Sequence, residues 1–412
     1  MLAATLLAAC GASSNSFTDG AVRDGDARPD ALDAAAIDLG DATSSDAEDA
    51  PDVDGASACA PACASGDACI DGSCLPAPVV LARAPGCGVA RLALADGRLF
   101  WTESATGNVE SVANAVGGAP TRVASSQNKP GPITADDGNV YWGNDGDLTI
   151  GQITLPGDAT DAGAADAAAN GAASSFITAA AVVKGLLVSG NFLYYTSGPS
   201  TYRVARAGGA PSTLATFATC KLSQPVALAL DADYVYQTDM LSQYITRARN
   251  DGTQRVNDPC AAADAGAPQI AAPETITHSQ GELYFDAIYR AGDEVVWADH
   301  TSVYAKVPGA TSNRVVATSA GSDAVTGFVV TGGAVYFAEG AALGGSPTSG
   351  TIQVAPLGTP DGGDTPAGKV VALVQPGASS FAADATHVYW TTHAPSATAG
   401  AADDCAIVSV AK

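Results

Sequence analysis

Positive charge is scarce in this chain. Its 412 residues include 19 Lys and Arg against 43 Asp and Glu, which gives a formal net charge of −24 at pH 7. A surface of that sign repels phosphate backbones and anionic lipid headgroups. The composition therefore argues against nucleic acid as a partner and against electrostatic docking on an acidic membrane.

Long apolar runs are also absent. Apolar residues make up 47% of the sequence, but alanine inflates that share, and no run is long enough to span a bilayer. No stretch shows the 3.6-residue apolar stripe of a long amphipathic helix. We therefore expect an all-β chain.

Residues that carry chemistry are few. No HExxH sequence, paired-histidine spacing, nucleophile elbow or phosphate loop occurs, so we predict no catalytic residue, metal site or cofactor. Of the four histidines, His278 and His387 are expected in turns. His300 and His393 each follow a predicted strand and would suit a metal or acid–base pair only if they met at one channel mouth.

What the sequence does contain is a doublet that recurs seven times behind a turn, with first members 41 to 53 residues apart. A period of about 40 to 50 residues with four short strands per unit is typical of a β-propeller blade. The doublets are Phe100-Trp101, Tyr141-Trp142, Tyr194-Tyr195, Tyr236-Gln237, Tyr284-Phe285, Tyr336-Phe337 and Tyr389-Trp390. In the fifth unit Val296-Trp297 is an alternative, and the two candidates lie too close for two blades. We interpret the aromatics as wedges that pack blade against blade.

The fourth unit shows the internal pattern. Residues 226–230 alternate, 231–233 form an Asp-rich turn, 234–239 are β-rich, and a further strand at 244–248 precedes a turn at 250–252. Asp96, Asp136, Asp231 and Asp384 occupy equivalent turn positions, which favours hairpin geometry over catalysis.

The two ends of the repeat region predict a closed ring. The last unit stops after its third strand, and an extra apolar run, residues 79–82, precedes the first unit. If that run supplies the missing outer strand, the open sheet edge disappears. We therefore predict a seven-bladed β-propeller over residues 76–412, with an N-terminal strand closing the last blade.

The doublets with their followers, such as Trp101-Thr102-Glu103 and Gln237-Thr238-Asp239, resemble the YWTD family of propellers. The resemblance covers residues 79–412 and is greatest from Pro225 to Val256. Proteins of that family are usually six-bladed and extracellular, and they serve as binding or spacing modules. The resemblance thus implies a similar role here.

The N-terminal residues predict export. Leu7-Ala8-Ala9-Cys10 resembles a bacterial lipobox, which implies a signal at residues 1–9 and lipidation of Cys10. A signal peptide should also have a basic start and a longer apolar core, so we expect the true start to lie upstream. The alternative is a chance run of small residues before an ordinary cysteine.

An acidic linker is expected at residues 10–58. Residues 11–58 hold eleven Asp and one Glu against two Arg, a net charge of −12 + 2 = −10. Such a segment cannot bury enough apolar surface to offset its chain entropy and should stay extended and disordered. Calcium binding at 24–26 or 52–55 is an alternative, but no full loop of regularly spaced ligands is present.

The nine cysteines agree with an oxidising compartment. Cys59, Cys63, Cys69 and Cys74 form a cluster within residues 59–75 that predicts two disulfides, with zinc as the alternative. Two further disulfide candidates pair the remaining cysteines of the propeller: Cys87 with Cys405, and Cys220 with Cys260.

Two functions stay open. The first is a membrane-anchored lipoprotein, expected to be a monomer, whose propeller binds or spaces an unknown envelope or extracellular protein or glycan without catalysis. The second is an exported lyase or hydrolase with its site at the mouth of the central channel. Propellers host both classes, so the fold does not decide between them.

Overall fold

The structure of the chain is a computed structural model whose described residues form strands and no helix. It describes residues 62–64, 68–70, 73–84, 89–155, 173–216, 223–253, 256–257, 269–270, 273–278, 287–319, 323–341, 350–358, 368–373, 375, 377–394 and 404–412. No helix in these ranges could cross a membrane. The predicted linker and Cys10 lie outside them.

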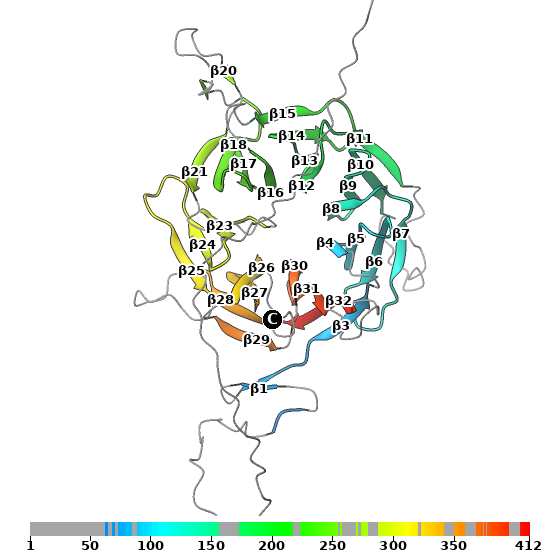
Figure 1. The fold of residues 1–412 in the computed structure, drawn as a ribbon, viewed down its shortest axis with the longest axis vertical. Helices are drawn as coiled ribbons and strands as arrows, with labels where there is room; N and C mark the ends of the chain where they lie inside the picture. The colour runs from blue at the N-terminus through cyan, green and yellow to red at the C-terminus, as the bar shows by residue number, and fades with distance from the viewer. Residues whose placement is uncertain are drawn as a thin grey trace, which may run out of the picture. The chain divides into compact units, whose positions relative to one another are not determined.

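Seven four-stranded antiparallel sheets surround a central opening as the blades of a β-propeller (Figure 1). Blades 1 to 6 run outward from the centre in chain order. Blade 1 is β4 (Val89–Ala95), β5 (Arg98–Glu103), β6 (Asn108–Ala113) and β7 (Thr121–Ala124). Blade 2 is β8 (Pro130–Asp136), β9 (Asn139–Asn144), β10 (Thr149–Thr154) and β11 (Ser174–Thr178), and blade 3 is β12 (Val183–Ser189), β13 (Phe192–Ser197), β14 (Ser200–Ala205) and β15 (Ser212–Thr216). Blade 4 is β16 (Pro225–Leu230), β17 (Tyr234–Asp239), β18 (Tyr244–Arg249) and β21 (Glu274–His278), and blade 5 is β22 (Tyr289–Ala291), β23 (Glu294–Ala298), β24 (Ser302–Lys306) and β25 (Arg314–Thr318). Blade 6 is β26 (Asp323–Thr331), β27 (Ala334–Ala341), β28 (Gly350–Pro356) and β29 (Lys369–Leu373).

Blade 7 confirms the predicted closure of the ring. Its strands are β30 (Ser379–Ala383), β31 (His387–Ala394), β32 (Asp404–Ala411) and, outermost, β3 (Val79–Arg83) from the beginning of the repeat region. β3 pairs antiparallel with β32, with Val79 opposite Ser409. The two ends of the propeller are therefore held in one sheet, which covers an edge that would otherwise be open.

The fifth blade resolves the alternative in the sequence. Val296-Trp297 lies in β23, the second strand of blade 5, where the doublets of the other blades lie. Tyr284-Phe285 lies outside the described residues. A long insertion separates β18 from β21 and contains a small hairpin, β19 (Val256–Asn257) with β20 (Gln269–Ile270).

The two side chains of each doublet lie on opposite faces of their blade. The first member packs toward the next blade and the second toward the preceding blade, so seven apolar clusters fill the seven interfaces. The facing pairs, in ring order, are Phe100 with Trp142, Tyr141 with Tyr195, Tyr194 with Val235, Tyr236 with Trp297, Val296 with Phe337, Tyr336 with Trp390, and Tyr389 with Trp101. This arrangement confirms that the recurring aromatics are wedges.

Two of the buried tryptophans donate their indole N–H to a nearby glutamine, whereas that of Trp297 has no hydrogen-bond partner among the described residues. The indole N–H of Trp142 donates to Gln127 at 2.9 Å, and that of Trp390 donates to Gln375 at 3.0 Å. Both glutamines precede the inner strand of the tryptophan's own blade. Gln237 replaces an aromatic in blade 4, is fully buried, and accepts a hydrogen bond from Thr201 of blade 3. Its Oε1 is thereby paired, whereas its buried Nε2 has no hydrogen-bond partner among the described residues.

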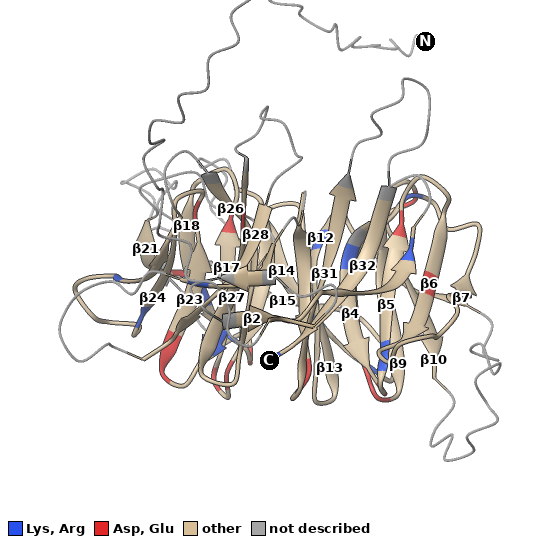
Figure 2. Cartoon of the chain, turned by 90° about the horizontal axis from the view of Figure 1, so that it is seen from below, with Lys and Arg blue, Asp and Glu red and all other residues tan. Residues whose placement is uncertain are grey.

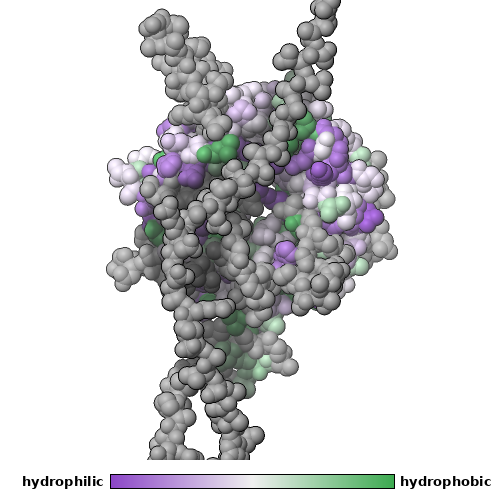
Figure 3. All heavy atoms as spheres, in the orientation of Figure 1, coloured by the Kyte–Doolittle hydropathy of each residue, from purple (hydrophilic) through white to green (hydrophobic). Residues whose placement is uncertain are grey.

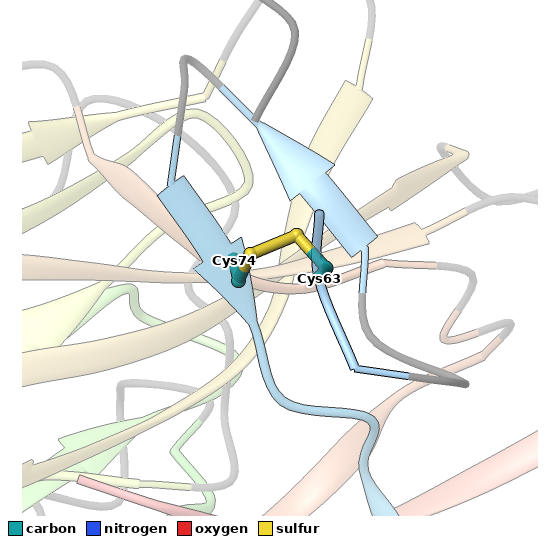
Figure 4. Close-up of a disulfide and its surroundings, with 2 residues drawn as sticks. All are labelled: Cys63 and Cys74. Atoms are coloured by element: carbon teal, nitrogen blue, oxygen red, sulfur yellow. A yellow bond between two sulfur atoms is a disulfide. The ribbon is translucent and has the colours of Figure 1, made fainter. Parts of the chain in front are cut away.

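A short hairpin precedes the ring: β1 (Ala68–Ile70) pairs with β2 (Ser73–Leu75). Cys63 and Cys74 are joined by a disulfide there (Figure 4), and Cys69 is also disulfide-bonded, with a partner outside the described residues. A sulfur in a disulfide cannot ligate zinc as a thiolate. The predicted disulfide cluster is therefore confirmed for these three cysteines, and the zinc alternative is wrong for them.

Candidate binding site at the centre of the ring

The inner strands share a local irregularity that shapes the central channel. The pairing between the inner and second strands shifts near the start of the inner strand in blades 1, 2, 3, 4, 6 and 7. Such a β-bulge inserts an extra residue and leaves a backbone group without its ladder partner. Threonines of the second strand replace that partner: the N–H of Gly185 donates to Thr196, and the N–H of Ala227 donates to Thr238.

A ring of apolar side chains surrounds the channel just beyond the bulges. Each blade contributes the residue paired with the second member of its doublet, or the equivalent residue in blade 5. We call these residues the apolar ring: Leu92, Ile133, Leu186, Leu228, Ile288, Phe328 and Phe381. They line one cavity of about 260 Å³ at the centre of the propeller.

Arg91 stands out in this cavity. It directly precedes Leu92, at a position where the other blades carry Pro132, Gly185, Ala227, Ala287, Gly327 and Ser380. Two of these blades leave no room for any side chain: a Cβ on Gly185 would lie 2.4 Å from the Val226 carbonyl oxygen, and one on Gly327 would lie 2.9 Å from the Phe381 ring. Arg91 is thus the one long side chain at this level of the channel.

Lys184 is the second basic residue of the cavity lining, one position before Gly185 in the bulge of β12. Its ammonium lies 3.4 Å from Asp145, and both side chains are about one-third exposed (37% and 34%). No acidic side chain belongs to the cavity lining among the described residues.

Tyr289 lies across the ring from Arg91, in blade 5 (Figure 1), and also lines the cavity. Its phenol donates to the Phe328 carbonyl at 3.3 Å, and its ring packs edge-on against Phe328. Burial raises the pKa of Tyr289 to about 12, and the charge of Arg91 acts in the opposite direction. The phenol therefore stays neutral near pH 7.

The surface outside the channel is different in character. Hydrophilic residues predominate on the described part of the face in Figure 3, with scattered hydrophobic ones. The large hydrophobic residues exposed in the described ranges are Val80, Val116, Leu241 and Val307. Most of the apolar ring is itself buried in the interfaces between blades.

The recurring turn acids are structural, as predicted. Asp136, Asp231 and Asp384 each accept the N–H groups of the residues two and three positions on, at 2.7–2.9 Å. These turns lie along the lower edge of the ring in Figure 2. Asp96 differs, because Asp96 and Gly97 both have positive φ (47° and 64°) and form a two-residue hairpin turn.

The same three carboxylates also join neighbouring blades. Asp136 pairs with Arg206 of blade 3 at 2.8 Å, Asp231 lies 3.4 Å from Arg290 of blade 5, and Asp384 accepts from Asn114 of blade 1 at 3.1 Å. Asp231 and Asp384 further accept the phenols of Tyr236 and Tyr389, both at 2.6 Å. We call these contacts the aspartate latches.

The latches predict an acid-sensitive stability. Burial alone would raise the pKa of Asp384, but the Tyr389 phenol and the N–H groups of Thr386 and His387 outweigh burial and hold that pKa well below its usual range. A folded-state pKa below the unfolded one means that the stabilisation is complete above about pH 4 and is lost as the pH falls toward the folded value. We expect Asp384→Asn to lower the free energy of unfolding by about 1–2 kcal/mol at neutral pH. We also expect its Tm to fall less than that of the wild type between about pH 5 and pH 3.

Asp233→Asn is the matched control, since it removes the same charge from a turn side chain that is 67% exposed. Thermal unfolding of both variants across this pH range checks the prediction. An Asp384→Asn profile parallel to that of the control would contradict it.

The histidines do not meet. His300 follows β23, as predicted, whereas His393 lies inside β31 rather than after it, and neither belongs to the lining of the described channel. His387 begins β31, one residue beyond the turn. The turn position predicted for His278 is wrong: it ends β21, with its ring edge-on to Tyr244 at 4.8 Å. The described residues contain no cluster of His, Cys, Asp and Glu that could hold a metal ion.

Among the remaining cysteines, Cys405 is buried in β32 and is disulfide-bonded. Its partner lies outside the described residues, as do Cys10, Cys59, Cys87, Cys220 and Cys260. The pairings of Cys87 with Cys405 and of Cys220 with Cys260 stay predictions.

Comparison with known proteins identifies the fold alone. No protein-family model and no curated protein matches the chain. The structure is similar to the WD40 β-propeller domain of Doa1, with TM-score 0.52 and 9% identity over 80% of this chain and 96% of that one. It is similar to a catalytically inactive virginiamycin B lyase from Staphylococcus aureus with quinupristin, with TM-score 0.51 and 11% identity over 80% and 98%. A nidogen/laminin complex matches at TM-score 0.40 and 15% identity over 55% and 79%, too low to carry an argument.

Proposed function

We propose that this chain is an exported lipoprotein, anchored through Cys10, whose β-propeller acts as a non-enzymatic binding or scaffolding module for an envelope protein or glycan. The observation that carries the proposal is disulfide bonding. Cys63 and Cys74 are joined, and Cys69 and Cys405 are also bonded, which is typical of an oxidising compartment outside the cytosol. The lipobox-like residues and the acidic linker fit a tether that displays a folded module away from a membrane.

The rigidity of the ring supports a binding role. Seven filled interfaces and the closing strand hold the loops of the propeller in fixed positions, and loops on a rigid scaffold commonly carry recognition. A pocket in which His300 or His393 faced an acid or an arginine across the channel would favour the enzymatic alternative. Neither histidine lines the described cavity.

The anchor is tested by labelling producing cells with an alkyne-tagged palmitate and separating the membranes. We expect the chain to carry the label and sediment with membranes, and Cys10→Ser to lose both while keeping its thermal stability. Ser13→Ala is the matched control and should behave as wild type. An unlabelled wild-type chain in the soluble fraction would overturn the anchor.

The binding role is tested in the same cells by chemical crosslinking, purification and mass spectrometry. A stoichiometric partner recovered with the wild type supports the proposal and identifies what the propeller serves. If the same purification repeatedly yields the chain alone, the proposed binding role is wrong.

A further inference from the structure

One of the seven blade interfaces differs from the others in its chemistry. In six interfaces an aliphatic residue of the third strand packs with the aromatic second member of the next blade's doublet. The six aliphatic residues are Val109, Ile150, Ile245, Val303, Ile352 and Ile407. In blade 3 the equivalent residue is Thr201, which is paired with Thr196 as Ile245 is paired with Thr238. The residue that it contacts in blade 4 is Gln237, so two polar side chains replace an aliphatic–aromatic pair.

Gln237 has a fixed orientation in this interface. Its Oε1 accepts a hydrogen bond from the Thr201 hydroxyl, and both residues are 0% exposed. The Nε2 of the same amide is buried and has no hydrogen-bond partner among the described residues. The contact between the two blades thus pairs the acceptor of the amide and leaves its donor unpaired.

A second unpaired polar atom lies beside this amide. Thr246 is directly opposite Gln237 in the pairing of β17 with β18, and residues opposite each other in an antiparallel pair have Cβ atoms about 4.5–5.5 Å apart. Thr246 is 1% exposed, and its Oγ1 is buried without a hydrogen-bond partner in the described part of the chain. An amide donor and a hydroxyl, both buried and both unpaired, therefore lie side by side on one face of blade 4.

The size and polarity of this place suit a water molecule. Burying an unpaired donor or acceptor costs the free energy of its lost hydration, and nearly all such atoms in native proteins are paired with protein or ordered water. A buried water needs a polar site with room for one molecule and about two to four polar partners. The side chain of Gln237 is smaller than the indole, phenol or phenyl group that takes this position in the other six blades. Both the partners and the smaller side chain are therefore present here.

We propose that the interface between blades 3 and 4 is a binding site for one internal water molecule, which accepts a hydrogen bond from Gln237 Nε2 and donates one to Thr246 Oγ1. Together with the hydrogen bond from Thr201, the water completes a chain of polar contacts from β14 through β17 to β18. A bridging water is nearly as favourable in enthalpy as a direct hydrogen bond. This site goes beyond the proposed function, because neither the lipid anchor nor an envelope partner requires it.

A crystal structure of the full chain, at a resolution that shows ordered water, locates the molecule. We expect one water within about 2.7–3.2 Å of both Gln237 Nε2 and Thr246 Oγ1. A direct hydrogen bond between the two side chains, or a close contact with no water between them, would overturn the proposal. A side chain from outside the described residues that pairs with either atom would overturn it as well.

A substitution of Thr246 tests the same site in solution. Thr246→Val keeps the shape of the side chain and removes the hydroxyl, so the bound water loses a partner. We expect the equilibrium constant for unfolding, measured in urea, to rise about fivefold, as for the loss of one ordinary hydrogen bond. Removing an unpaired hydroxyl from a dry interface would instead leave the constant unchanged or lower it, and that result would contradict the water site.

Thr275→Val is the matched control for this substitution. It makes the same chemical change on an exposed residue of the neighbouring strand β21, opposite Thr246, and should change the unfolding constant by no more than about twofold.

A double-mutant cycle tests whether Gln237 and Thr246 share the water. Gln237→Leu removes the amide, so the water loses its donor and the Thr246 hydroxyl loses the water. In that background we expect Thr246→Val to leave the unfolding constant unchanged or to lower it, in contrast to the rise expected in the wild type. Additive effects of the two substitutions would show that no shared water links them.

Discussion

Leu81→Asp is expected to lower the free energy of unfolding by more than about 3 kcal/mol, whereas Val80→Asp should lower it by less than about 1 kcal/mol. The two residues are neighbours on the closing strand β3. Leu81 is 6% exposed and lies in the cluster between blades 7 and 1, together with Trp101 and Tyr389, while Val80 is 46% exposed. A carboxylate at Leu81 would have to lose its hydration or pull β3 away from the ring, and at Val80 it stays in water.

Urea unfolding followed by tryptophan fluorescence measures both variants, because all four tryptophans are buried in the ring interfaces. Loss of β3 would expose the edge of β32, so we also expect Leu81→Asp to aggregate more readily on heating. Equal, small effects of the two substitutions would mean that the closing strand contributes little to the ring.

The repeat and its closure could be predicted because both depend on local chemistry. Turn residues, a doublet and alternating apolar runs recur in every blade. Each of these signals predicts a strand or turn from neighbouring residues alone, without knowledge of contacts that are distant in the sequence. The closing strand at 79–83 was predictable for the same reason. The last repeat lacks a fourth strand, and the apolar run before the first repeat belongs to no other blade.

The fifth repeat shows that the interval between doublets is not enough to locate every doublet. The insertion between β18 and β21 displaces the doublet of blade 5 from the expected interval, and loops of that length cost a propeller little free energy. Tyr284-Phe285 fits the interval better, yet Trp297-Ala298-Asp299 matches the followers of the other doublets. Asp299 accepts the N–H groups of Thr301 and Ser302 in the tight turn that such followers form. The turn expected at His278 would directly precede Tyr284-Phe285; with Val296-Trp297 as the doublet of blade 5, His278 instead ends the outer strand of blade 4.

The channel lining could not be predicted from alternation. A bulge adds one residue to the strand, so the period of two no longer tells which side chain faces the channel. Arg91 and Lys184 lie in that irregular stretch. Arg91 can be found from the sequence by aligning the seven repeats on their doublets. In that alignment Arg91 occupies a position at which the other six repeats have a small residue.

Trp142→Ala is expected to lower the free energy of unfolding by about 3–5 kcal/mol, as large aromatic deletions in a packed core do. Trp142 is fully buried between blades 1 and 2, where it faces Phe100, and its removal also costs Gln127 one of its two donors, the other being Asn144. The control is Val116→Ala, whose side chain is 74% exposed on blade 1 and should change stability by less than about 0.5 kcal/mol.

A double-mutant cycle with Gly151 tests whether Trp142 acts as a wedge. A Cβ on Gly151 would lie 2.4 Å from the indole ring, so Gly151→Ala should destabilise the wild type by about 1–3 kcal/mol through overpacking. In the Trp142→Ala background the new methyl group enters the vacated space, and we expect most of that cost to disappear. Additive effects, or a stable Trp142→Ala protein, would show that this tryptophan does not hold the blades together and that the doublets need another explanation.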